Sequence, residues 1–333
     1  MSNNNFFHGL ILLALSGCHK EKTAPAPNDL FQEVNYRNEM RQFVIGISTY
    51  ARGIDQNFII IPQNGQELCT TDGSADGTLE TAYLDAIDGQ GREELYYGFD
   101  NNDDEATPSE YTENWKPYLD RMHENGTTIL VTDYCSSALH VDQSTMLNES
   151  SNFLSFAANA RDLNLIPNYP ALPTGYNNAA ITSMEQANNF LYIINPDQYT
   201  NKNAFLNALA RTNYDIIIMD AFFDDQPFDP SDLEQIRYKS NGGQRLLIAY
   251  MSIGEAEDYR FYWDNEWTLT SPEWLGSNNP DWPGNYKVEY WNPNWQSIIY
   301  GNQQSYTHQI LEMGFDGAYL DIIDAFEYYE EGE

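Results

Sequence analysis

Several acidic residues stand directly after, or a few residues beyond, short apolar runs that are typical of buried strands. Asp133, Asp220, Glu255 and Asp321 follow four different runs. Hydrolysis of a glycosidic bond needs two carboxyl groups, one protonated and one ionised, on opposite sides of that bond. Crowding of acids raises the pKa of at least one carboxyl, which keeps its proton near neutral pH. These residues therefore indicate carboxylate acid–base chemistry at a rim where strands end.

Two of these carboxylates form the predicted catalytic pair. Asp220 closes the run Asp-Ile-Ile-Ile-Met-Asp, and Glu255 follows Tyr-Met-Ser-Ile-Gly. Gly254 allows a sharp turn that would expose the next side chain at the end of the strand. Glu257 is the competing choice for Glu255, and a helix N-cap is the structural alternative for Asp220.

Other polar and aromatic residues near the predicted strand ends would bind substrate. Aromatic faces stack on the apolar faces of sugar rings, and Tyr and Trp tolerate a wet cleft. Aromatic residues are frequent in the long segment after Glu255, and we expect about half of them to pack onto the fold instead. The predicted substrate-binding residues are Tyr50, Arg52, Asp133, Tyr169, Tyr259, Trp263 and Asp321.

The elements that must position these residues alternate between short apolar runs and longer mixed segments. The runs lie at 43–47, 58–61, 95–99, 128–131, 163–166, 190–194, 216–219, 246–251 and 317–320. Helix-like segments include 110–125, 150–164, 201–212 and 294–313.

This rhythm predicts an α/β fold, a (β/α)8 barrel of the TIM type, in which strand ends and following loops build the active site. Because nine runs exceed eight strands, we assign 58–61 to a loop after the first strand. A doubly wound sheet is the rival, but no Gly-x-Gly-x-x-Gly motif follows an early strand.

Three stretches carry a resemblance to a known family. They are Tyr-Met-Ser-Ile-Gly-Glu-Ala-Glu-Asp-Tyr-Arg at 250–260, Gly-Phe-Asp-Gly-Ala-Tyr-Leu-Asp at 314–321 and Tyr-Leu-Asp-Ala-Ile-Asp-Gly-Gln-Gly-Arg-Glu-Glu-Leu at 83–95. The chain resembles the endo-α-1,4-polygalactosaminidases, glycoside hydrolase family 114, over most of residues 40–330. The resemblance implies a (β/α)8 barrel and cleavage within α-1,4-linked galactosamine polymers. It maps the catalytic roles onto Asp220, favoured as the acid, and Glu255.

The net charge of the chain limits the classes of partner that it can bind. It has 16 Lys and Arg against 50 Asp and Glu, a formal net charge of −34 at pH 7. Such a surface repels nucleic acids and polyanions and favours neutral or cationic partners. A hydrophobic content of 41% excludes a disordered acidic tail. With the resemblance, the expected partner is a cationic amino-sugar polysaccharide, and the expected state is a monomer.

The N-terminus predicts export. An apolar run at 9–15 is too short to span a membrane but suits a secretory signal. Leu-Ser-Gly-Cys at 15–18 resembles the bacterial lipobox, although no Lys or Arg precedes the run. We predict a lipoprotein signal at 1–17, lipidation of Cys18, a tether at 18–39 and a catalytic domain at 40–330. The protein would be anchored to a bacterial membrane by its lipid; a buried N-terminal strand is the alternative.

Two points remain open from the sequence alone. Cys69 and Cys135 could form a disulfide or remain free thiols. The scattered histidines and cysteines predict no metal site, and no cofactor is expected. The competing function is a non-catalytic glycan-binding surface lipoprotein. Catalysis by this pair requires that both carboxyl groups face one cavity, and a structure with Asp220 and Glu255 on opposite barrel ends would exclude the hydrolase.

Overall fold

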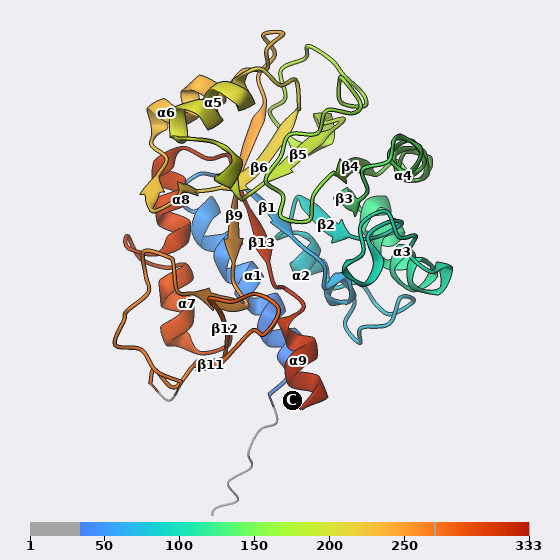
Figure 1. Ribbon diagram of the computed structural model, residues 1–333. Coiled ribbons are helices and arrows are strands. Elements are labelled where there is room, and N and C mark those ends of the chain that lie inside the picture. Colours follow the sequence, from blue (N-terminus) through green and yellow to red (C-terminus); the bar gives the residue numbers. More distant parts are fainter. Residues whose placement is uncertain (1–33, 270, 333) are drawn as a thin grey trace, which may run out of the picture. The chain divides into compact units, whose positions relative to one another are not determined.

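The computed structural model describes residues 34–269 and 271–332, and its compact unit spans Asn35–Glu333. The predicted signal segment and Cys18 lie outside the described residues. Helix α1 (Tyr36–Arg52) begins inside the segment expected to be a tether. Parallel strands occupy the middle of the unit, with α3 (Ser109–Glu124) and α4 (Ala138–Ser150) on one side and α7 (Pro293–Ile299) and α8 (Tyr306–Met313) on the other (Figure 1).

The parallel strands form a five-stranded sheet in the order β1-β13-β9-β6-β5 and a three-stranded sheet in the order β2-β3-β4. Their central strands are apolar on both faces, as strands covered on both sides require. The bounds are β1 Ile59–Pro62, β2 Gly89–Glu93, β3 Thr128–Tyr134, β4 Leu154–Ala158, β5 Phe190–Ile193, β6 Ile216–Asp220, β9 Leu246–Ser252 and β13 Gly317–Asp321.

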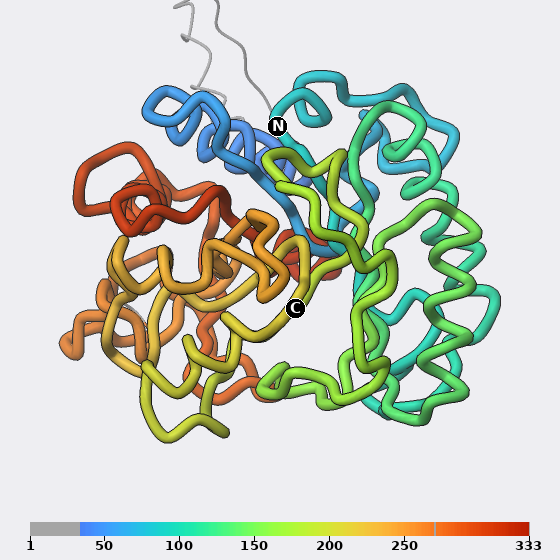
Figure 2. Tube along the Cα trace, turned by 90° about the horizontal axis from the view of Figure 1, so that it is seen from above, coloured from blue at the N-terminus to red at the C-terminus, as the bar shows by residue number. Residues whose placement is uncertain are grey.

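The two sheets follow each other in chain order around the unit. Seen from above, the chain passes once around, from blue α1 through green to orange and red (Figure 2). Strands β1 and β2 meet at a single parallel bridge, Gln63 to Gly91, and β4 lies beside β5 without a ladder of hydrogen bonds between those strands. The predicted α/β fold with parallel strands is therefore confirmed, but a barrel closed by continuous hydrogen bonding is not formed.

Shorter elements surround the strands. Helices α2 (Thr81–Leu84), α5 (Lys202–Ala210), α6 (Pro230–Ile236) and α9 (Ala325–Glu331) lie in the connections or at the end of the chain. An antiparallel sheet combines β10 (Glu255–Glu257), β12 (Asn285–Val288) and β11 (Leu275–Asn278), and β7 (Phe222–Phe223) pairs with β8 (Gln226–Pro227). None of the helices in the described part of the chain has the length and apolar character needed to cross a bilayer.

The first predicted strand is wrong. Residues 43–47 lie in α1, whose buried side chains Met40, Phe43, Val44, Ile47 and Ala51 recur every three or four positions. That is the spacing of an amphipathic helix, and it extends beyond the five residues taken as a strand. The run at 58–61, expected to be a loop, instead supplies β1.

Two further strands were predicted at the wrong positions. Residues 95–99 follow β2 as a loop, and residues 163–166 lie in the connection after β4. Strand β4 itself falls within the segment 150–164 that was predicted to be helical. The runs at 128–131, 190–194, 216–219, 246–251 and 317–320 do form strands, as expected.

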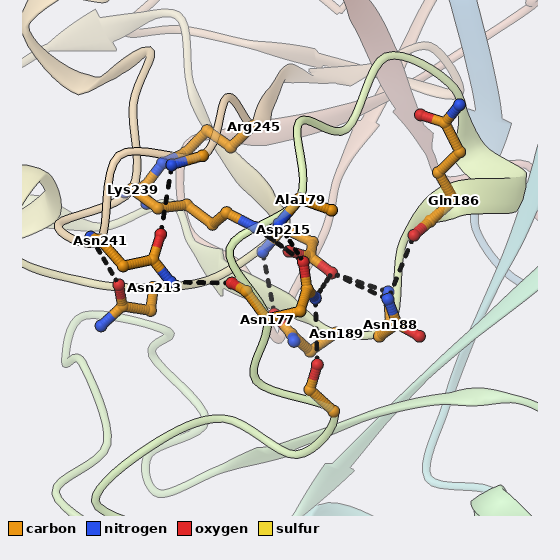
Figure 3. A network of polar contacts seen from close by, with 12 residues as sticks. Asn177, Ala179, Gln186, Asn188, Asn189, Asn213, Asp215, Lys239, Asn241 and Arg245 are labelled. Carbon is orange, nitrogen blue, oxygen red and sulfur yellow. Dashed lines mark hydrogen bonds and ion pairs between the residues drawn. The ribbon is translucent and has the colours of Figure 1, made fainter.

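A buried ion pair fixes the long connection between β4 and β5. Lys239 Nζ lies 2.7 Å from Asp215 Oδ1, and both side chains are fully buried. Asn177 donates to Asp215 Oδ2 (2.9 Å) and accepts from Lys239 Nζ (3.0 Å). The backbone N–H of Asn188 also donates to Asp215 (2.9 Å). This network, drawn in Figure 3, ties the connection to the start of β6.

The two cysteines of the described part are both free and buried. Burial raises the pKa of Cys69 to about 12, so its thiol stays protonated and inert. The alternative of two structural thiols is thereby confirmed over a disulfide.

Candidate active site

A cavity of about 480 Å³ opens where the parallel strands end. Its wall combines six carboxylates with three arginines and a group of aromatic side chains. The acidic residues are Glu93, Glu94, Asp220, Glu257, Asp321 and Asp324; the arginines are Arg92, Arg161 and Arg260; the aromatic residues are Tyr134, Tyr192, Tyr250, Tyr259 and Trp282.

Arg260 holds two of these carboxylates. Its Nη1 lies 2.8 Å from Asp220 Oδ2, and its Nε lies 2.6 Å from Glu257 Oε2. The backbone N–H of Phe222 also donates to Asp220 (2.8 Å). Burial raises the pKa of Asp220, and the Arg260 guanidinium opposes that rise. Asp220 thus has a cation in contact that stabilises its ionised form.

Asp321 has a different environment. It accepts hydrogen bonds from Tyr250 Oη (2.6 Å) and from the Ile322 backbone N–H (2.8 Å). In the described part of the chain no cationic side chain lies within ion-pair distance of Asp321. Burial raises the pKa of Asp321 to about 7, and the neighbouring charges of Asp324 and Glu257 add to the rise. This carboxyl can keep a proton near neutral pH.

Glu93 resembles Asp321 in this respect. Its oxygens accept hydrogen bonds from Tyr134 Oη and from the Gln63 amide. Burial raises the pKa of Glu93 to about 7, and the charge of Asp321 contributes. The cavity therefore holds carboxyls of two kinds, those bound by an arginine and those without a cation in contact.

The strands set the separation between Asp220 and Asp321. Asp220 ends β6 in register with Tyr250 of β9, and β13, which ends with Asp321, is the next strand. Two strand spacings, with an offset of two residues because Asp321 is level with Ser252, place the two backbones about 12 Å apart. Glycosidase carboxyl groups lie about 5 to 9.5 Å apart across the bond that they cleave. Side chains that line one cavity from these two strands suit that task.

The raised pKa values predict how stability depends on pH. The folded-state pKa values of Glu93, Asp321 and Asp324 are each raised to about 7, so folding favours their protonated forms. Their contribution to stability is complete below the unfolded pKa near 4 and is lost as pH rises through 7. We expect a lower unfolding midpoint at pH 8 than at pH 5.5, measured by circular dichroism. Asp321→Asn should narrow that difference; an unchanged difference would contradict the assignment.

Glu255 does not line the cavity with Asp220, contrary to the predicted pairing. Its carboxylate lies in a neighbouring cavity, where it accepts from Asn279 Nδ2 (2.9 Å) and Asn285 Nδ2 (3.3 Å). Glu257 stands two positions further along β10, about 7 Å away on the same face. That distance decides which of the two acids meets Arg260 and Asp220.

The chain bends at Gly254 between β9 and β10, as expected, and the glycine also has a packing role. A side chain at this position would meet the Ile322 carbonyl oxygen at 2.2 Å, so glycine permits close packing between the two backbones. This contact orients the start of β10 and hence both acids.

Two predicted substrate-binding residues lie away from the cavity because their segment is a helix. Tyr50 and Arg52 stand at the end of α1. Tyr50 Oη donates to the Asn302 carbonyl (2.9 Å), and Arg52 Nη2 lies 2.7 Å from Asp88, directly before β2. Arg52 therefore lies at the amino end of a strand, opposite the end that bears the cavity.

Three more predicted residues lie elsewhere in the fold. Asp133 is fully buried and accepts from the Tyr96 backbone N–H (2.8 Å) and from Ser144 Oγ (2.6 Å). Tyr169 is on a loop and donates to Asp142 (2.8 Å). Trp263 packs against other aromatic rings at centroid distances of 5.0 and 4.9 Å. None of the three lines the cavity, whereas Tyr259 and Asp321 do.

Sequence reasoning missed Glu93 and Arg92, and it counted Trp282 only among the aromatic residues that follow Glu255. The signal was present in Arg-Glu-Glu at 92–94, part of the stretch quoted for the family resemblance. Because the second strand was predicted at 95–99, these residues stood before a strand and not at its end. Trp282 lies in a connection with no periodicity that would indicate its direction.

Comparison with known proteins gives a matching family. Residues 175–332 match the model of glycoside-hydrolase family GH114. This region contains β5, β6, β9 and β13, and with them Asp220, Glu257 and Asp321.

Three relatives are similar to this chain over about two fifths of its length. An uncharacterized protein of Methanocaldococcus jannaschii is 45% identical over 133 residues, which are 40% of this chain and 37% of that protein. Uncharacterized proteins of Thermotoga maritima and Deinococcus radiodurans are 38% and 39% identical over 133 and 125 residues. The matches cover 40% and 38% of those two proteins, so the similarity spans well under half of each relative. Residues 175–332 are therefore similar to glycoside-hydrolase family GH114.

Proposed function

We propose that the protein is a glycoside hydrolase whose reaction takes place in the cavity lined by Asp220 and Asp321. The observation that supports this most is the presence of two kinds of carboxyl in one cavity. Asp220 is in contact with Arg260, whereas Asp321 has a pKa of about 7. Glycosidic hydrolysis requires one ionised and one protonated carboxyl across a bond. The family match supports the same reaction class.

The charges favour Asp321 as the general acid. A group with a pKa near 7 both holds a proton at neutral pH and releases it readily to the leaving oxygen. Asp220, kept ionised by Arg260, would act as the base or nucleophile on the other side. This assignment reverses the role first expected for Asp220 and replaces Glu255 by Asp321.

Aromatic side chains at the mouth support a sugar substrate. Tyr259 and Trp282 line the cavity and remain 54% and 51% exposed. Exposed aromatic rings beside a polar cavity suit stacking on a sugar ring. We further propose that the fold is a (β/α)8 barrel. The enzyme would cleave internal bonds of a polysaccharide that contains α-1,4-linked galactosamine. The net charge of −34 would attract the free amines of such a polymer.

Export and lipid anchoring are part of this proposal. They rest on the apolar run and on Cys18, and a polysaccharide substrate outside the cell is consistent with them. Labelling with a radioactive fatty acid should mark the full-length protein and not Cys18→Ser.

The hydrolase proposal is tested by reducing-end release. The full protein should release reducing ends from polygalactosamine or galactosaminogalactan, with neutral α-glucan as the comparison polymer. Activity on the neutral polymer alone would contradict the proposed galactosamine substrate but would still support a glycoside hydrolase. Binding of these polymers with no release from any of them would favour the glycan-binding alternative.

The pH profile tests the role of Asp321. Since its pKa is raised to about 7, the acid is protonated below that pH and loses its proton above it. We expect kcat/KM on an N-acetylated substrate to fall about tenfold per pH unit above pH 7. The N-acetylated form is used because it has no amine that titrates. A profile that stays flat from pH 7 to 9 would contradict this role.

A further inference from the structure

A second cavity adjoins the one that contains Asp220. Its volume is about 330 Å³, and Ile322 and Asp324 line both cavities. Asn285 lines the first cavity and donates its amide hydrogen to Glu255 in the second. The two cavities are therefore neighbours.

Glu255 is a buried carboxylate without a cation in contact. Its residue is 4% exposed, and among the described residues its hydrogen-bond donors are the neutral amides of Asn279 and Asn285. Lys287 is its partner in the β10–β12 ladder, yet the lysine Nζ lies 3.2 Å from the centroid of the Tyr328 ring. A buried carboxylate is stabilised most by a bound cation, and the lysine does not supply that contact.

The rest of the cavity is also acidic. Asp324, Glu327 and Glu331 line it with Glu255, against Lys287 as the one cation among the lining residues. Tyr328 and Tyr329 add aromatic surface. A ligand that combines a positive charge with a sugar ring fits carboxylates next to aromatic faces.

We infer that this second cavity binds the protonated amine of a sugar residue adjacent to the one in the first cavity, with Glu255 as the carboxylate that accepts from it. This inference rests on the proposed glycan substrate and assigns Glu255 to binding. The acid sits beside the catalytic cavity because β10 places it two residues before Glu257. Recognition of the amine would set which residues of a mixed polymer can be cleaved.

Binding to a catalytically silent protein tests the inference. Asp220→Asn would be titrated by calorimetry with a galactosamine oligosaccharide and with its fully N-acetylated form. Adding Glu255→Gln should weaken binding of the free-amine oligosaccharide about tenfold and change the acetylated one less than twofold. Glu312→Gln, on an exposed side chain of α8, is the matched control and should change neither.

A second variant guards against a folding defect. Glu327 is exposed at the rim, so Glu327→Gln should fold normally and weaken the amine form by a smaller factor. An equal loss for both oligosaccharides, or no loss in Glu255→Gln with an unchanged unfolding midpoint, would overturn the inference. Wild type that hydrolyses no substrate would contradict the proposed function, whereas amine-selective binding would still decide the role of Glu255.

Discussion

Asp220→Asn is expected to lower kcat by about 10³-fold on any polymer that the wild type cleaves. The amide has the same size but cannot carry the negative charge that the base or nucleophile needs. Glu257 would still hold Arg260 through its 2.6 Å contact, so the cavity should keep its shape. Reducing-end release under saturating substrate measures the loss, and calorimetry of the bound oligosaccharide shows that the site is intact.

Matched variants make this result specific. Asp321→Asn should cost a similar factor, because it removes the proton donor. Asp225→Asn is the control, because it makes the same chemical change at an exposed position after β7. This variant should keep full activity. Activity of Asp220→Asn within threefold of wild type would reject the assignment. If Glu255→Gln lowers kcat more than Asp321→Asn does, the result would favour Asp220 and Glu255 as the catalytic pair.

Lys239→Met should destabilise the fold by about 3–5 kcal/mol. The change leaves Asp215 fully buried with its ion-pair partner gone, and the penalty of an unpaired buried charge exceeds the lost attraction. Asp215 directly precedes β6, so the same network supports the strand that ends in Asp220. Urea unfolding followed by tryptophan fluorescence measures the loss.

Two comparisons define the cause of that loss. Lys116→Met breaks a partly exposed ion pair with Asp120 within α3 and should cost less than about 0.5 kcal/mol. Combining Lys239→Met with Asp215→Asn should recover part of the stability, since the buried charge is then absent. A double variant no more stable than Lys239→Met alone would show that packing of the lysine side chain, and not its charge, is what matters.

Much of the strand pattern could be predicted because burial on both faces leaves a local signal. The runs that became β3, β5, β6, β9 and β13 are apolar through their length and end in or near a polar residue. In contrast, β2 reads Gly-Gln-Gly-Arg-Glu and has no such signal. Its strand conformation comes from pairing with β3, which is a contact between distant parts of the chain. The prediction for residues 43–47 in α1 was wrong because the local signal was ambiguous. A run of five mostly apolar residues fits a strand and a helix equally well.

The candidate site divides in the same way. The sequence by itself determined that Asp220 and Asp321 end strands of a parallel sheet, because both close apolar runs and such strand ends share one edge. Only the tertiary structure decided that Glu257, and not Glu255, meets Arg260 beside Asp220. The two glutamates differ by two positions on one strand face, so the choice depends on how β10 pairs with β12. The close approach of Gly254 to Ile322 accompanies that pairing, and no local periodicity encodes such a contact.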